Sequence, residues 1–185
     1  MATIIFDFDD TLFDTQRLKE QIFEILEKSG VPNDIIHRSY KQSQSILGSY
    51  SIDNHLKILK DKYDISEEMN INDWLNDADL TSHVLPEIDE LLQNLSNNHY
   101  LILLTKGDFD FQTLKINKSD LKKHFREIHI IKEDKDLFLK DKSFSGSVYF
   151  VNDKDKENEI IKNNFPDFNI IKKEYGEPLR LPVFE

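Results

Sequence analysis

The 185-residue sequence contains no cysteine, which excludes disulfide bonds, thiolate catalysis and cysteine-ligated zinc. It has only five glycines, and these form neither a P-loop nor a GxGxxG pattern. The six histidines lack a metal-binding spacing such as HExxH. The absence of cysteine also fits the reducing cytoplasm, which is the location that we expect for this protein.

Long hydrophobic runs and positive charge are also scarce. No apolar stretch approaches the roughly 20 residues needed to cross a bilayer, and the N-terminus has neither the basic start nor the apolar length of a signal peptide. The 24 Lys and Arg are outnumbered by 35 Asp and Glu, which gives a formal net charge of −11. Neither a membrane nor nucleic acid is therefore an expected partner, since polyanions are bound through clustered basic residues. An anionic small molecule remains compatible, because a local lysine or a metal ion can reverse the charge inside a cleft.

The apolar segments that are present predict an α/β fold with a parallel sheet. Hydrophobic residues make up 38% of the chain, enough for one folded domain with an insertion. Continuous apolar runs typical of doubly buried strands lie at 3–8, 100–105, 126–131 and 147–151, with a weaker one at 167–172. Helical patterns at 86–98, 111–125 and 155–165 alternate with these strands, as in βαβ units.

Residues 15–80 interrupt this alternation. Helical patterns there cover 15–30, 33–47, 51–63 and 66–77, and no strand pattern separates them. The chain is therefore expected to form one strand, insert a helical block at 15–80, and return to complete a core made of 1–14 and 81–185. The tail at 174–185 is expected to be irregular.

Three acidic residues follow the first apolar run, in the segment TIIFDFDDTLFD at 3–14. In an open parallel sheet, ligands bind beyond the carboxyl ends of the strands, where Asp7 and Asp9 fall. The alternation of a strand places both side chains on one side, and hard cations such as Mg²⁺ prefer such oxygen ligands. An isolated acidic pair is more often part of a polar turn that ends a strand. Other parts of the sequence are therefore needed to distinguish a metal site from such a turn.

The segment Asp7-Phe8-Asp9-Asp10-Thr11-Leu12 resembles the first motif of the haloacid dehalogenase-like hydrolases, in which an apolar strand precedes DxDxT. The resemblance implies a Rossmann-like core. It also implies that Asp7 is a nucleophile that accepts a phosphoryl group and that Asp9 is a general acid and base. Both roles are chemically reasonable for carboxylates at this position.

Two later strand ends resemble further motifs of that family. LILLTKGD ends a strand at Thr105, which would hydrogen-bond a phosphoryl oxygen, with further donors from Lys106 and the backbone of Gly107. VYFVNDKDKEN has Asn152 where the family usually has Gly or Asp. The resemblance implies that the next residue, Asp153, binds Mg²⁺ together with Asp7 and the backbone carbonyl of Asp9.

Two further residues in these regions have expected roles. Glu157 is a candidate for orienting a water bound to the metal. The family also has a lysine after the third strand that offsets charge between the nucleophile and the phosphate. IKEDKD offers Lys132 and Lys135, and we prefer Lys135 because Lys132 can still belong to the strand end.

The resemblance covers 1–14 and 86–172 and implies an α-helical cap at 15–80, of which Phe13, Gln16 and Arg17 are candidates to face substrate. We expect a Mg²⁺-dependent phosphatase that acts on a small phosphorylated metabolite through an aspartyl-phosphate. Dehalogenation is not expected, because the family's dehalogenases lack the second Asp. A phosphomutase with the same core, or a non-catalytic protein that binds phosphorylated ligands or a protein partner, remains an alternative. The sequence does not determine the oligomeric state.

Overall fold

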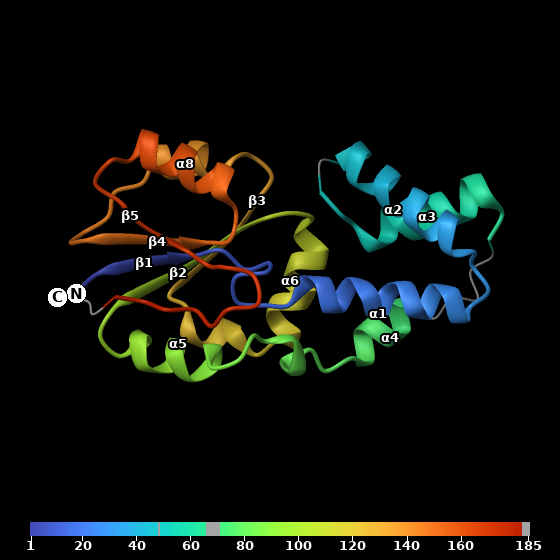
Figure 1. Ribbon diagram of the computed structural model, residues 1–185, viewed down its shortest axis with the longest axis horizontal. Helices are drawn as coiled ribbons and strands as arrows, with labels where there is room; N and C mark the ends of the chain where they lie inside the picture. The colour runs from blue at the N-terminus through green and yellow to red at the C-terminus, as the bar shows by residue number, and fades with distance from the viewer. Residues whose placement is uncertain (48, 66–70, 183–185) are drawn as a thin grey trace.

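A five-stranded parallel sheet forms the centre of the protein in the computed structural model, which describes residues 1–47, 49–65 and 71–182 (Figure 1). The strand order is β3-β2-β1-β4-β5. The strands are β1 (Thr3–Phe6), β2 (Tyr100–Lys106), β3 (Glu127–Ile131), β4 (Val148–Asn152) and β5 (Asn169–Lys172). The α/β fold with a parallel sheet that the sequence predicts is thus confirmed.

The position of β1 in the middle of the sheet creates the ligand-binding edge. The chain adds β2 and β3 on one side of β1 and then crosses back to place β4 and β5 on the other. Phe6 is in register with Val151, and the backbone amide of Asp7 donates to the carbonyl oxygen of Val151 over 2.9 Å. The carboxyl ends of β1 and β4 are therefore neighbours at the switch point of the sheet, where open α/β folds bind ligands.

Both faces of the sheet are covered. Ile4 and Phe6 belong to a core cluster shared with α5 (Ile88–Ser96), whereas Ile5 belongs to a second cluster shared with α7 (Lys135–Lys140) and α8 (Asp155–Asn164). Figure 1 shows α5 and α8 on opposite sides of the sheet. Because alternate side chains of one strand enter different cores, the strand has to be apolar at every position.

After β1 the described part of the chain forms four helices before it returns to the core: α1 (Thr15–Lys28), α2 (Asn33–Leu47), α3 (Ile52–Tyr63) and α4 (Ile71–Asp77). Figure 1 shows them beyond one end of the sheet, with α2 and α3 packed side by side. The exit and the return of the chain lie side by side, because Asp14 N donates to His83 O over 2.7 Å and Leu85 N donates to Leu12 O over 2.9 Å. Within the described residues, no helix has the length and apolarity to cross a bilayer.

Several element boundaries differ from those expected. Strand β1 ends at Phe6 rather than at residue 8, because the chain turns out of the sheet after Asp7. The helix expected at 111–125 is split into α6 (Phe109–Lys118) and a 3₁₀ turn, η2 (Leu121–His124), by Asp120 with its φ of 59°. A further 3₁₀ turn, η1, covers Thr81–His83, and α7 was not predicted. Residues 66–70 of one expected helix and 183–185 of the tail lie outside the described residues, and 174–182 contain no helix or strand, as expected for the tail.

Candidate active site

Asp7 lies directly after β1 and is almost completely buried, with 1% of its surface exposed. Its Oδ1 atom is 2.8 Å from the ammonium nitrogen of Lys135, whose side chain is only 2% exposed. Lys135 is the first residue of α7. Lys132, the other lysine that the sequence offers, is exposed. The fold thus brings Lys135 and Asp7 together across the switch point.

The same ammonium group contacts two residues that follow β4. Lys135 Nζ lies 2.8 Å from Glu157 Oε2 and donates to Asn152 Oδ1 over 3.2 Å. Asn152 is fully buried, and its amide donates to Asn158 Oδ1, whose own amide donates back to the Asn152 carbonyl. Glu157, expected to orient a metal-bound water, is therefore engaged with Lys135 instead. Asn152 serves to hold the lysine, and its neutral amide does so without adding a charge.

Asp153 contributes a second carboxylate close to Asp7. Burial, together with the negative charge of Asp7, raises the pKa of Asp153 from 3.8 to about 6. Asp153 Oδ1 and Asp7 Oδ2 are both buried, and within the described part of the chain neither atom has a hydrogen-bond partner. Two buried carboxylate oxygens without donors are a costly arrangement unless a cation joins them.

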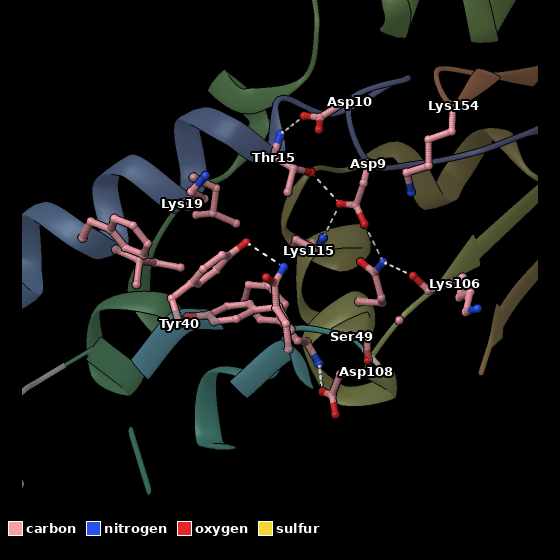
Figure 2. A pocket seen from close by; sticks show the side chains of 18 of the residues that line it. Asp9, Asp10, Thr15, Lys19, Tyr40, Ser49, Lys106, Asp108, Lys115 and Lys154 are labelled. Carbon is pink, nitrogen blue, oxygen red and sulfur yellow. Dashed lines mark hydrogen bonds and ion pairs between the residues drawn. The ribbon is translucent and has the colours of Figure 1, made fainter. Parts of the chain in front are cut away.

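Asp9 is held by a different set of donors, shown in Figure 2. Thr15 Oγ1 donates to it over 2.5 Å, Gln112 Nε2 donates over 2.7 Å, and Lys115 forms an ion pair with it. Burial alone would raise the pKa of Asp9, but the charge of Lys115 and these hydrogen bonds outweigh burial, so the pKa lies below its ordinary value. In this structure the Asp9 carboxyl group is therefore deprotonated and accepts these hydrogen bonds.

Thr105 ends β2 beside this network. It is fully buried, and its Oγ1 accepts a hydrogen bond from Gln112 Nε2 over 2.9 Å, which leaves its hydroxyl hydrogen available to another acceptor. The side chain of Lys106 pairs with Asp134 at 2.6 Å. The backbone amide of Gly107 donates to Ile131 O over 3.0 Å in this structure, and its expected role as a donor to phosphate stays a prediction.

Gly107 has a different reason to be glycine. A Cβ atom at this position would lie 2.8 Å from Gln112 Nε2, so the side chain of Gln112 would have to move. The absent side chain leaves room for Gln112 to reach both Asp9 and Thr105. Gly107 therefore contributes to the site by leaving room for the side chain of Gln112.

A pocket of about 390 Å³ opens beside these residues, between α1, α2 and α6. Asp9, Lys106, Lys154 and Glu157 line one end, whereas the buried Asp7 and Thr105 are not among its lining residues. Burial lowers the pKa of Lys154, but the charges of Asp7, Glu157, Asp153 and Asp9 outweigh burial and raise that pKa above its ordinary value, so Lys154 is a cation at this end of the pocket.

The substrate-facing candidates chosen from the sequence do not line this pocket. Phe13 is fully buried, Gln16 donates to Asp10 over 3.0 Å, and Arg17 donates to the carbonyl oxygen of Ser82 over 2.7 Å. The pocket is lined instead by Thr15 and Lys19 and by residues of the later turns of the same helix. Gln16 and Arg17 belong to α1, whereas Phe13 precedes it, and none of the three lines the pocket in this structure.

Two residues that hold Asp9 were not identified from the sequence. Gln112 and Lys115 both lie on α6, 103 and 106 positions away from Asp9. Their side chains are buried beside those of Phe111 and Ile116. Two polar residues on the apolar face of a helix are the signal that could have identified them, because such residues are buried only with a partner.

Comparisons with known proteins give the family and the fold of the chain. The sequence model of the haloacid dehalogenase-like hydrolases matches residues 1–144. No curated protein sequence matches the chain.

Three solved structures show the same fold at low sequence identity. A haloacid dehalogenase-like hydrolase from Burkholderia xenovorans LB400 is 18% identical, with a TM-score of 0.81 over 95% of this chain and 83% of its own. The magnesium-bound HAD-hydrolase YfnB from Bacillus subtilis is 17% identical, with a TM-score of 0.60 over 98% and 90%. A protein described as a beta-phosphoglucomutase from Thermotoga maritima is 19% identical, with a TM-score of 0.61 over 96% and 88%.

Proposed function

The chain belongs to the haloacid dehalogenase-like hydrolases, and we propose that it is a Mg²⁺-dependent phosphatase acting on small phosphate monoesters. The observation that carries the proposal is the environment of Asp7. One of its oxygens is 2.8 Å from the buried ammonium of Lys135, and the other is buried without a hydrogen-bond partner in the described residues. Such a carboxylate is held in place by the lysine and retains an oxygen that no protein donor occupies.

The residues present fit Mg²⁺. Asp7 Oδ2 and Asp153 Oδ1 are two buried, unpartnered carboxylate oxygens, which are hard ligands of the kind that Mg²⁺ prefers. In the described residues no third acidic or histidine side chain joins them, so the backbone carbonyl of Asp9 and water would supply the other ligands. When bound, Mg²⁺ would offset the negative charge of the carboxylates and of the phosphate.

The proposed reaction begins at Asp7. An oxygen of Asp7 attacks phosphorus, the bond from phosphorus to the ester oxygen breaks, and an aspartyl-phosphate forms. Lys135 and Thr105 would hold phosphoryl oxygens, since both bring a donor to this point. Water then attacks the aspartyl-phosphate, which releases phosphate and restores Asp7.

Asp9 would donate the proton that the leaving alkoxide takes up and would later accept one from the attacking water. The pairing with Lys115 opposes the first task, because it keeps Asp9 charged. An anionic substrate would reverse this effect, since its charge repels the Asp9 carboxylate and draws the Lys115 ammonium toward the phosphate. A halide leaves without a proton, so a carboxyl group held at this position favours phosphate esters over halogenated substrates.

We assign residues 15–80 as the cap and 1–14 with 81–185 as the core. The paired hydrogen bonds from Asp14 to His83 and from Leu85 to Leu12 support this division, because they close the core beneath the inserted helices. The pocket between α1, α2 and α6 then lies between cap and core. A cytoplasmic location and a small phosphorylated metabolite as the partner stay predictions.

The test is a panel of phosphate monoesters, including p-nitrophenyl phosphate, assayed with Mg²⁺ and with EDTA. Wild-type protein should release phosphate only with the metal, and Asp7→Asn should lose activity by a factor of at least about 10³. Asp110→Asn, which changes an exposed acid on α6, is the matched control and should keep wild-type activity. Wild-type activity in Asp7→Asn, or no phosphate release from any ester, would contradict the proposal.

A further inference from the structure

Four aromatic rings line one side of the pocket between cap and core. They are Phe23 of α1, Tyr40 of α2, Tyr50, which precedes α3, and Phe111 of α6. We call this set the aromatic wall. Consecutive rings are in contact, with centroid distances of 5.3 Å for Phe23 and Tyr40, 4.9 Å for Tyr40 and Tyr50, and 5.4 Å for Tyr50 and Phe111. The wall is therefore a continuous apolar surface that begins on the core and ends on the cap.

The wall begins next to the reacting groups. The ammonium of Lys115, which pairs with Asp9, lies 5.1 Å from the centre of the Phe111 ring. Tyr40, farther along the wall, lines the same pocket as Asp9 and Asp10. A group leaving from a phosphate beside Asp9 would therefore face these rings.

The pocket has the size and the polarity of a site for a small ring compound. Its volume of about 390 Å³ lies within the range of roughly 300–1,000 Å³ that is usual for small-molecule sites. Lys19 is the cation at the far end, 5.4 Å from the centre of the Tyr40 ring and 5.9 Å from that of Phe23. No carboxylate of the described residues pairs with Lys19, whose ammonium donates to the side-chain oxygen of Gln16 over 3.3 Å.

We propose that this pocket selects phosphate monoesters whose leaving group carries a planar aromatic ring, which packs against the aromatic wall. The inference rests on the proposed phosphatase function and adds the class of leaving group to it. Rings gain from edge-to-face and offset-stacked contacts beyond the area that they bury, whereas a saturated ring of equal size does not. Polyhydroxylated leaving groups fit less well, because they need several hydrogen-bond partners and the wall offers few.

The alternative is that the four rings only pack the cap against the core. Phe111 is buried, as that reading requires, but Tyr40 and Phe23 are half-buried and line the open pocket. The hydroxyl of Tyr40 accepts a hydrogen bond from Gln44, which also lines the pocket. Tyr40 is therefore the residue to change.

The experiment compares benzyl phosphate with cyclohexylmethyl phosphate. The two esters have the same charge, the same number of carbon atoms and a similar alkoxide leaving group, so they differ chiefly in ring planarity. Wild-type protein should favour benzyl phosphate by about tenfold in kcat/KM. Tyr40→Leu should reduce that ratio to about twofold or less. Tyr63→Leu, which changes another half-buried cap tyrosine outside the pocket, should keep the wild-type ratio.

Binding is measured in parallel by calorimetry with the Asp7→Asn protein, so that the inference does not depend on turnover. This protein should bind benzyl phosphate more tightly than cyclohexylmethyl phosphate by a similar factor. Equal kcat/KM for the two esters would leave the phosphatase function standing and overturn the inference. If neither ester is hydrolysed, equal binding or no binding of the two esters would overturn it, and preferential binding of benzyl phosphate would support it. A benzyl preference that survives in Tyr40→Leu would also overturn it.

Discussion

The ammonium group of Lys115, on α6, forms an ion pair with Asp9, in the loop that follows β1. The lysine side chain is 2% exposed and that of Asp9 is 21% exposed, so the pair is largely removed from water. The ammonium also lies over the rings of Phe8, Phe13 and Phe111, at 5.5, 5.9 and 5.1 Å from their centres. These rings and the carboxylate together replace the water that the charged lysine loses on burial.

Lys115→Met should destabilise the protein by about 3 kcal/mol, because it leaves the Asp9 charge in a buried position without its cation. The measurement is chemical denaturation of the two proteins. Lys122→Met removes an exposed lysine from η2 and should change the free energy of unfolding by less than about 0.5 kcal/mol. Adding Asp9→Asn to Lys115→Met should recover part of the loss. Equal stability of Lys115→Met and wild type would show that the pair does not hold α6 to the loop.

Lys135→Met should lower kcat/KM for p-nitrophenyl phosphate by a factor of about 10² or more, because it removes the cation 2.8 Å from Asp7. Lys132→Met should have almost no effect, since Lys132 is exposed. Steady-state kinetics on both variants decides between the two lysines that the sequence left open. A larger loss in Lys132→Met would reverse the assignment.

Magnesium should raise the melting temperature more at a pH of about 7.5 than at about 5. The pKa of Asp153 is raised from 3.8 to about 6 by burial and by Asp7, so without metal its contribution to stability is present below pH 3.8 and is lost as the pH rises through 6. Magnesium binds the charged carboxylate and offsets that loss above pH 6. Thermal unfolding with Mg²⁺ and with EDTA at both pH values measures the effect.

The control for the magnesium effect is a pair of substitutions after β4. Asp153→Asn should remove most of the rise in melting temperature. Glu157→Gln should retain it, because Glu157 lies 2.8 Å from Lys135 and pairs with that lysine. A magnesium-induced rise that persists unchanged in Asp153→Asn would exclude Asp153 as a ligand.

His55 should make the cap sensitive to acid. Its ring lies between Ser39 Oγ, at 2.8 Å from Nε2, and the hydroxyl of Tyr50, at 3.1 Å from Nδ1. Burial lowers the pKa of His55 from 6.5 to about 4, against a smaller opposing effect of the Ile36 backbone. The unfolded chain therefore binds a proton more readily, and stability should fall by about 3 kcal/mol as the pH drops from 6.5 to 4.

Denaturation across this pH range should show a flatter curve for His55→Gln than for wild type. His37→Gln changes an exposed histidine of α2 and should leave the slope as it is in wild type. The comparison separates the histidine from the carboxylates that titrate at the lower end of the range. Parallel curves for His55→Gln and wild type would contradict the effect of burial on His55.

The local sequence was sufficient to predict the strands of the sheet and the position of the acidic residues that follow the first strand. The run TIIF is apolar at every position because alternate side chains enter opposite cores, and that requirement can be read without a structure. Asp7 and Asp153 follow strands that the sequence identifies, and the carboxyl ends of parallel strands necessarily share one edge. Boundaries were less accurate, because ends such as that of β1 depend on hydrogen bonds to other strands.

The tertiary structure alone decided which side chains meet at that edge. The ends of β1 and β4 adjoin only because of the strand order, and the packing of α7 then directs Lys135 rather than Lys132 to Asp7. Lys115 reaches Asp9 across 106 positions, and the aromatic wall combines residues of cap and core. Spacing along the chain determines the period and the face of an element, but contacts between distant elements depend on how those elements pack. The sequence therefore determined the chemistry available to this protein, and the fold determined the partners of each reactive group.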